Sequence, residues 1–210
     1  MTLSAIERAR RIKIILFDVD GVLTDGTIWI YPIPVGQPDG TILTKMVEAK
    51  GYNAHDGAGI TLARLGGMKL GVITKRISET VALRARDLKL EFVYQGQAFK
   101  MQAVRKIMEQ EGVTLDEIAF VGDDVVDLPV LRVCGFAVAV ANARAEVKAE
   151  AHYVTPNRGG EGAGRDAIEF ILDAKGVLKQ CHEAMIDEKN STLALIDIGK
   201  GGDLPSEPLA

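Results

Sequence analysis

The sequence predicts an α/β fold in which a mostly parallel sheet lies between two layers of helices. Short apolar runs rich in β-branched residues alternate with longer segments of helical spacing, which is the pattern of a parallel sheet covered on both faces. The chain has 210 residues, of which 47% are hydrophobic and 26% charged, and these values are typical of a globular protein. This length suits one core with a modest addition and is too short for two full enzymatic domains.

Five apolar runs are the expected strands of the sheet, and the turn formers Gly135 and Asn142 bound the last of them. These strands cover residues 12–17, 69–73, 91–94, 118–121 and 136–140. Segments between and after them suit helices, which we expect at 59–65, 78–88, 100–111, 128–133, 143–149, 165–174 and 177–189. The low-complexity segment 199–210 is expected to be a flexible tail.

One stretch interrupts the alternation soon after the first strand. Residues 27–31 and 41–47 predict two strands separated by the turn-rich sequence YPIPVGQPDG, and therefore a projecting hairpin. Trp29 and Tyr31 alternate with Ile28 and Ile30, so both faces of this ribbon carry apolar side chains. The hairpin suits either a flap over a site or a surface for subunit pairing, and its apolar faces favour pairing.

Charge and composition argue against several classes of protein. The 25 basic and 29 acidic residues give a net charge of −4, which does not favour a nucleic-acid binder. No apolar run approaches the roughly 18 residues of a membrane helix, and the charged N-terminal segment does not resemble a signal peptide. Two distant cysteines, Cys134 and Cys181, suggest neither a zinc site nor a disulfide framework. We therefore expect a cytoplasmic protein that binds a small molecule.

Two carboxylates come directly after the first strand, in the sequence FDVDGVLTDG. At this spacing, the side chains of Asp18 and Asp20 start on the same side of the chain, where both can face a crevice at the carboxyl edge of the sheet. An isolated DxDG is equally compatible with a simple turn. The polar residues that follow the other strands favour the functional interpretation.

Three further strand ends carry polar side chains. Thr74 ends the second strand, Lys100 opens the helix after the third, and the fourth runs into VGDDVVD. Taken singly, the threonine suits a helix cap and the lysine a solvated charge. The acidic group would repel itself without a cation; it comprises Asp123, Asp124 and Asp127.

Together these residues predict a site for phosphate chemistry at one edge of the sheet. Carboxylates suit Mg²⁺, while a lysine and a hydroxyl group can bind phosphoryl oxygens. An aspartate can attack phosphorus to form an aspartyl phosphate. A second carboxylate can protonate the leaving oxygen and then activate water.

In these four motifs and their order, the sequence resembles the haloacid dehalogenase (HAD) superfamily of phosphotransferases. The motifs are DVDGV at 18–22, the strand end at Thr74, Lys100, and GDDVVD at 122–127. The resemblance implies a three-layer Rossmann-like fold, with Asp18 as nucleophile, Asp20 as general acid and base, and Thr74 and Lys100 as phosphoryl anchors. It also implies Mg²⁺ on Asp18, the Asp20 carbonyl and Asp123, with Asp124 and Asp127 nearby.

Within that superfamily, the chain is similar to the KDO 8-phosphate phosphatases, which lack a large cap domain. The strings NAHDGAGI, VYQGQ, HYVT and GGEGAG carry this similarity, which covers about residues 12–176. It implies a phosphorylated sugar acid as substrate and a place in lipopolysaccharide biosynthesis. It also implies a homotetramer in which the hairpins form an intersubunit barrel and a neighbouring subunit closes the site. Residues 1–176 would be the hydrolase domain, with the hairpin at about 26–50, and 177–210 a C-terminal helix and tail.

Some residues depart from the family pattern and leave the substrate open. Lys75 stands where the family often has the glycine of TGR, and His55 stands where an arginine is common. Four residues are predicted to contact substrate, namely Arg76, Lys75, His55 and Asp56. KDO 8-phosphate is the first expectation, and KDN 9-phosphate or another small sugar phosphate is the alternative. A non-enzymatic phosphoacceptor domain is a third interpretation, which the position of DxD on the first strand disfavours.

Overall fold

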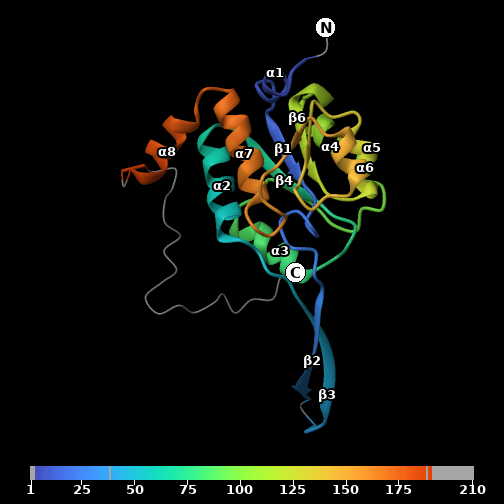
Figure 1. Ribbon diagram of the computed structural model, residues 1–210. Coiled ribbons are helices and arrows are strands. Elements are labelled where there is room, and N and C mark those ends of the chain that lie inside the picture. Colours follow the sequence, from blue (N-terminus) through green and yellow to red (C-terminus); the bar gives the residue numbers. More distant parts are fainter. Residues whose placement is uncertain (1–2, 38, 188, 191–210) are drawn as a thin grey trace.

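The computed structural model describes residues 3–37, 39–187 and 189–190, and its centre is a six-stranded parallel sheet (Figure 1). The strand order is β5-β4-β1-β6-β7-β8, so β1 lies in the interior of the sheet. Phe17, the last residue of β1, is paired with Val72 of β4 and Val121 of β6. The strands are β1 (Ile14–Phe17), β4 (Lys69–Ile73), β5 (Phe92–Tyr94), β6 (Ile118–Gly122), β7 (Phe136–Ala139) and β8 (Tyr153–Val154).

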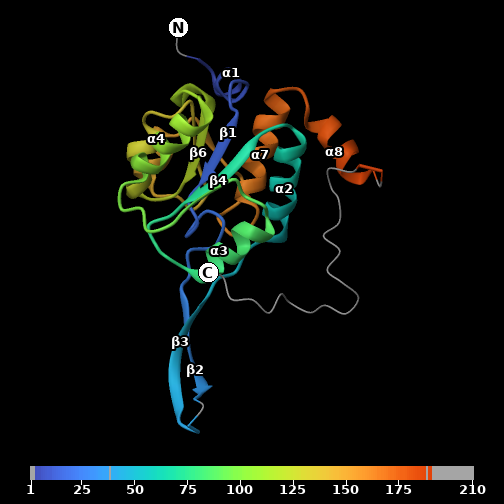
Figure 2. The same ribbon diagram turned by 180° about the vertical axis from the view of Figure 1, so that it is seen from behind.

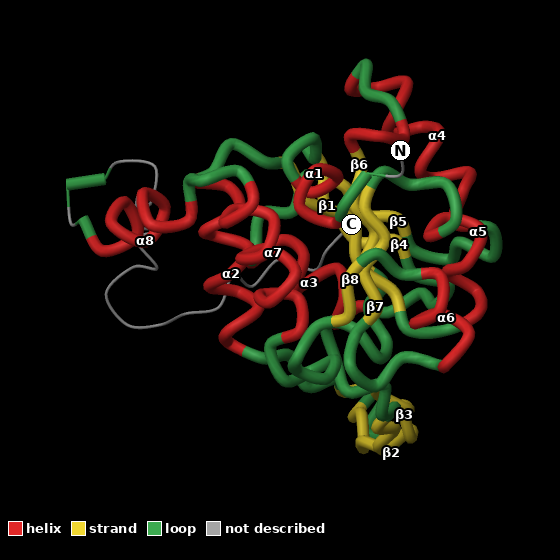
Figure 3. The backbone as a smooth tube through the Cα atoms, turned by 45° about the horizontal axis from the view of Figure 1, so that its top comes forward, coloured by secondary structure: helices red, strands yellow, loops and turns green. Residues whose placement is uncertain are grey.

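Helices cover both faces of this sheet, as the alternating pattern predicts (Figure 3). On one face lie α1 (Ala5–Ala9), α2 (Ala54–Leu65), α3 (Glu79–Asp87) and α7 (Ala163–Ala174), and α8 (Leu178–Ile186) packs against α2 and α7. On the other lie α4 (Lys100–Glu111), α5 (Leu128–Leu131) and α6 (Ala145–Glu150). Every residue of β1 and β7 is buried, because both faces of these strands are covered. The predicted three-layer α/β fold is confirmed.

The hairpin projects away from the helices at the carboxyl edge of the sheet (Figures 1 and 2). It consists of β2 (Trp29–Gly36) and β3 (Ile42–Ala49), which pair from Trp29 with Ala49 to Gly36 with Ile42. The prediction that 32–36 belong to the turn is wrong, because these residues continue β2. Pro32 and Pro34 are two residues apart, so the missing N–H groups lie on one side of the strand, which the free edge of a two-stranded ribbon tolerates.

Several element boundaries differ from those expected. Helix α2 begins at Ala54 rather than 59 because the Asn53 side chain caps it, accepting a hydrogen bond from the His55 N–H at 2.8 Å. Gly59 lies inside this helix. It faces α7 so closely that a Cβ at this position would lie 2.9 Å from Arg165 Cα. Helix α1 and the two-residue strand β8 were not predicted. The expected tail at 199–210 lies outside the described residues. Among the helices that are described, none is both long and apolar enough to cross a membrane.

Candidate active site

Four strand ends bring polar side chains together at the carboxyl edge of the sheet. Asp18 follows β1, Thr74 follows β4, Lys100 begins α4 after β5, and Asp123 follows β6. The Asp18 backbone N–H donates to Val121 O at 3.0 Å, which continues the pairing of β1 with β6 up to the site. The adjacent parallel strands therefore place the predicted motifs at one edge of the sheet, where Asp18, Asp123, Asp127 and Lys100 form a cluster.

Lys100 bridges two aspartates at the centre of this cluster. Its Nζ lies 2.8 Å from Asp18 Oδ1 and 2.6 Å from Asp127 Oδ1, and its side chain is 2% exposed. Burial acts to lower the pKa of Lys100, but the charges of Asp18 and Asp127 outweigh burial and raise it. Lys100 is therefore a fixed positive charge beside Asp18.

Asp127 is fully buried and uses both of its carboxylate oxygens. Oδ1 accepts the hydrogen bond from Lys100, and Oδ2 accepts one from the Asp123 backbone N–H at 3.0 Å. The neighbouring Asp124 is exposed, and its side chain accepts a hydrogen bond from the Val125 N–H at 2.6 Å. Asp127 thus holds the loop that carries Asp123.

The acidic cluster fits a divalent cation. Ligand atoms of Asp18, Asp123 and Asp127 all lie within 4.8 Å of one another, and Asp123 Oδ1 is buried without a hydrogen-bond partner among the residues that the structure describes. Burial, followed by the charges of Asp18 and Asp127, raises the pKa of Asp123 to about 7. Burial also raises the pKa of Asp18 to about 6, although Lys100 opposes this rise. A hard cation with oxygen ligands would relieve this repulsion and keep the carboxylates ionised.

Asp20, two residues after Asp18, lies against the base of the hairpin. Its Oδ1 accepts a short hydrogen bond from Lys50 Nζ, and its Oδ2 lies 3.9 Å from Arg76 Nε. Glu48 joins both cations, at 2.6 Å from Arg76 and 3.4 Å from Lys50. The sequence interpretation missed Glu48 and Lys50, because only the path of the chain back from the hairpin brings them to Asp20.

Comparison with known proteins identifies the family. Residues 72–164 match the family model of the haloacid dehalogenase-like hydrolases. The chain is 34% identical over 175 residues to the 3-deoxy-D-manno-octulosonate (KDO) 8-phosphate phosphatase of Escherichia coli K12, over 83% of this chain and 87% of the relative. The chain belongs to the KDO 8-phosphate phosphatase family.

Solved structures of KDO 8-phosphate phosphatases share its fold. The enzyme from Yersinia pestis superposes with a TM-score of 0.74 at 34% identity, over 83% of this chain and 88% of that chain. The enzyme from Moraxella catarrhalis, solved with magnesium ion, phosphate ion and KDO, has a TM-score of 0.75 at 32% identity, over 86% of this chain and 97% of that chain. The predicted resemblance to this family is confirmed.

The four residues predicted to contact substrate differ in their surroundings and exposure. Arg76 lies beside Asp20, and its hydrogen bond to Glu48 raises the pKa of the guanidinium group. Lys75 is exposed after β4, and His55 is exposed at the start of α2. Asp56, in contrast, is buried and accepts a hydrogen bond from the Arg165 backbone N–H at 3.0 Å. This contact joins α2 to α7, and a substrate contact by Asp56 stays a prediction.

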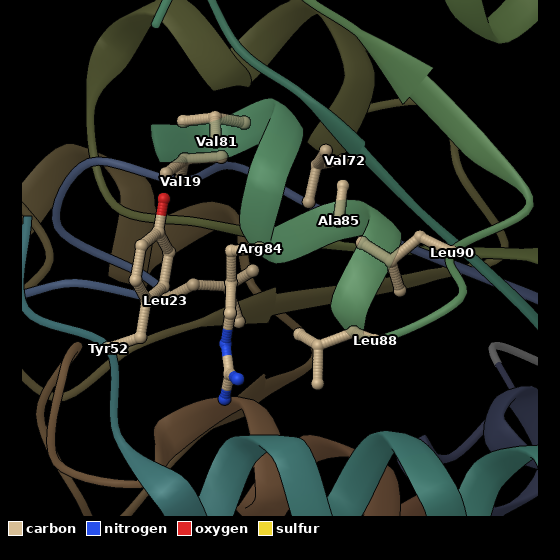
Figure 4. A pocket seen from close by; sticks show the side chains of 9 residues that line it. All are labelled: Val19, Leu23, Tyr52, Val72, Val81, Arg84, Ala85, Leu88 and Leu90. Carbon is tan, nitrogen blue, oxygen red and sulfur yellow. The ribbon is translucent and has the colours of Figure 1, made fainter. Parts of the chain in front are cut away.

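A small apolar cavity lies against α3 (Figure 4). It has a volume of about 10 Å³ and is lined by Val19, Leu23, Val72 and residues of α3 with its following loop, together with Tyr52. The Arg84 guanidinium lies 5.8 Å from the centre of the Tyr52 ring. Burial raises the pKa of Tyr52 to about 12, so its hydroxyl stays protonated. None of the acidic side chains of the KDO 8-phosphate phosphatase motifs lines this cavity.

Proposed function

We propose that the chain is a magnesium-dependent phosphatase that hydrolyses KDO 8-phosphate, or a closely similar phosphorylated sugar acid. The observation that carries this proposal is the buried contact of Asp18 with Lys100, 2.8 Å apart, beside Asp123 Oδ1, which no described residue hydrogen-bonds. Such a site has a nucleophile, a cation to bind phosphate and ligands for a metal. Similarity to KDO 8-phosphate phosphatases across most of the chain supports the choice of substrate.

In the first step, a carboxylate oxygen of Asp18 attacks phosphorus, and the bond from phosphorus to the ester oxygen breaks. Asp20, in its protonated form, gives its proton to that oxygen, so that the sugar acid leaves as an alcohol. The phosphoryl group is now on Asp18 as an aspartyl phosphate. Lys100 and the Thr74 hydroxyl bind its oxygens and stabilise the charge that develops on them.

In the second step, the Asp20 carboxylate takes a proton from water as the water oxygen attacks phosphorus. The bond between phosphorus and Asp18 breaks, inorganic phosphate leaves, and both aspartates regain their starting forms. Asp127 keeps Lys100 and the Asp123 loop in position through its two hydrogen-bonded oxygens.

Asp18, Asp123 and the Asp20 backbone carbonyl would hold Mg²⁺. When bound, the ion supplies positive charge that neutralises the carboxylates and the phosphoryl oxygens. The exposed residues Arg76, Lys75 and His55 would contact the sugar acid. A guanidinium pairs with a carboxylate through two hydrogen bonds, so Arg76 suits the carboxylate of the substrate.

The test is phosphate release from a panel of substrates, with Mg²⁺ and with a chelator. The panel contains KDO 8-phosphate, KDN 9-phosphate, hexose phosphates and an aryl phosphate. We expect Mg²⁺-dependent release with the highest kcat/KM on KDO 8-phosphate. Preference for KDN 9-phosphate would assign Lys75 and His55 to a changed specificity, and no Mg²⁺-dependent release from any substrate would overturn the phosphatase.

We further propose that the protein assembles as a homotetramer through its hairpins. Large apolar side chains are exposed along both strands, including Trp29, Ile30, Ile42 and Met46. An apolar ribbon of this kind favours association, because its burial removes apolar surface from water. A partner packed along the hairpins would also lie close to the site, since β3 ends beside Asp20.

A further inference from the structure

Asp20 belongs to a closed ring of four charged side chains. The other three members lie outside the four phosphatase motifs. Lys50 Nζ contacts Asp20 Oδ1 and lies 3.4 Å from Glu48 Oε1. Arg76 completes the ring, with its guanidinium nitrogens 2.6 Å from Glu48 Oε2 and 3.9 Å from Asp20 Oδ2. Charges therefore alternate in sign around the ring.

Lys50 is the buried member of this ring. Its side chain is 0% exposed, whereas that of Arg76 is 42% exposed. A buried ammonium group is unfavourable unless anions compensate it, and Asp20 and Glu48 supply that compensation. Its position differs from that of surface lysines such as Lys69, whose side chain is 51% exposed and paired with Glu111.

Glu48 is the second anion that contacts Lys50. The Ser78 hydroxyl donates to Glu48 Oε1 at 2.6 Å, and Arg76 donates to Oε2. Burial acts to raise the pKa of Glu48, but these hydrogen bonds and the Lys50 charge lower it, so Glu48 stays ionised. The end of β3 is thereby joined to the loop after β4.

Within the described residues, the carboxylate of Asp20 accepts one hydrogen bond, which comes from Lys50. The next residue is Gly21, with a φ of +91°, so the backbone turns sharply immediately after Asp20. Without Lys50, rotation of the Asp20 side chain would be restrained by the longer contact with Arg76 alone. Lys50 thus holds Oδ1, and Oδ2, which lies 3.9 Å from Arg76 Nε, is the oxygen that carries the transferred proton when Asp20 is in its protonated form.

We propose that Lys50 is a positioning residue for proton transfer by Asp20, held in place by Glu48. This inference rests on the proposed function, in which Asp20 protonates the leaving oxygen of the ester. It adds that the base of the hairpin takes part in catalysis, through Glu48 in β3 and Lys50 directly after it. The hairpin therefore has a role in each subunit's own site as well as a surface for association.

The test compares Lys50→Met with the wild type on two esters, under single-turnover conditions with enzyme in excess and Mg²⁺ saturating. A sugar phosphate has an alcohol leaving group that needs a proton, whereas an aryl phosphate with an acidic phenol leaves as an anion. We expect Lys50→Met to slow cleavage of the sugar phosphate on the order of 10²-fold, and that of the aryl phosphate much less. KM for the sugar phosphate should change little.

Three further variants separate positioning from general damage. Lys50→Arg keeps a cation beside Asp20 and should recover most of the sugar phosphate rate. Glu48→Gln keeps Lys50 but removes the negative charge that holds it, so we expect a smaller decrease in the sugar phosphate rate and little change in the aryl phosphate rate. This variant also provides the test if Lys50→Met does not fold. Lys69→Met removes a paired surface lysine at the start of β4 and should leave both rates unchanged.

The outcomes distinguish this inference from the proposed function. An active wild type whose ratio of sugar to aryl phosphate rates is unchanged in Lys50→Met and Glu48→Gln would overturn the positioning role alone. A wild type without Mg²⁺-dependent phosphate release would overturn the proposed function, and the role of Lys50 with it.

Discussion

Individual carboxylates in this protein differ in what surrounds them, and their surroundings decide their chemistry. Asp18, Asp123 and Asp127 lie together with one ammonium group, Lys100, so the cluster has an excess of negative charge. That excess favours a divalent cation. Asp56 is buried elsewhere, where α2 meets the start of α7, and within the described part of the chain its Oδ2 has no hydrogen-bond partner.

Asp56 predicts a pH-dependent effect on stability. Burial raises its pKa from 3.8 to about 6, so the folded state binds its proton more tightly than the unfolded state does. The contribution of Asp56 to stability is therefore lost as the pH rises from about 4 to about 6. Asp56→Asn does not titrate, so its free energy of unfolding relative to wild type should rise by about 2–3 kcal/mol across this range.

Urea unfolding of both proteins between pH 4 and pH 7 measures this difference, in which the other titrating groups cancel. A difference that stays constant with pH would contradict the buried, ionisable state of Asp56. The sequence could not predict this state, because the partner of Asp56 is a backbone N–H that lies 109 positions further along the chain.

At the scale of elements, the loop after β1 is the most tightly constrained part of the site. Gly21 has a φ of +91°, and a Cβ there would lie 2.2 Å from Asp123 Oδ2. Gly21→Ala should therefore displace Asp123 and lower kcat on the order of 10²-fold. Strain at the positive φ adds a loss of stability of about 1–2 kcal/mol.

Gly67→Ala is the matched control for this prediction. Gly67 also has a positive φ, +75°, but a Cβ there meets nothing within 4 Å. We expect this variant to lose similar backbone stability while keeping kcat. Steady-state kinetics and thermal unfolding of both variants provide the measurement, and equal kcat values in the two would count against the close approach of Gly21 to Asp123.

The sequence predicts the bounds of those helices and strands that are determined by residues within or next to the element. Strand β4 and helix α4 have the predicted bounds, since an apolar run defines the strand and Lys100 begins the helix that Gly112 ends. Boundaries set by contacts with distant residues were missed. Strand β8 has two residues and gives no apolar run, and β2 continues through two prolines because β3 pairs with it.

The same distinction applies to the candidate site. The places of Asp18, Thr74 and Asp123 were predictable because each directly follows a strand, and that of Lys100 because it begins the helix after β5. Their catalytic roles stay predictions. Lys50 and Glu48 were not, because they lie on the path of the hairpin back to the sheet. Their approach to Asp20 depends on how far the hairpin extends before it turns.

At the scale of the whole molecule, the hairpin predicts association. Ile42 and Met46 lie on one face of β3 and are 72% and 58% exposed. Wild-type protein should sediment as a tetramer of the 22.6 kDa chain. The double variant Ile42→Glu and Met46→Glu should sediment at a lower mass, because charge on this face opposes its burial.

Ile186→Glu in α8 provides the control, since Ile186 is 74% exposed at a site away from the hairpin. This variant should keep the mass of the wild type. A wild-type mass of 22.6 kDa would overturn the proposed tetramer.

The proposed mechanism depends on Asp18 as the nucleophile of a magnesium-dependent phosphatase. The most direct test is the rate of phosphate release from KDO 8-phosphate by the wild type and by Asp18→Asn, each with Mg²⁺ and with a chelator. We predict Mg²⁺-dependent turnover by the wild type and a loss of at least about 10³-fold in the variant, with thermal unfolding used to verify its fold. A folded Asp18→Asn protein that turns over KDO 8-phosphate at the wild-type rate would contradict the mechanism.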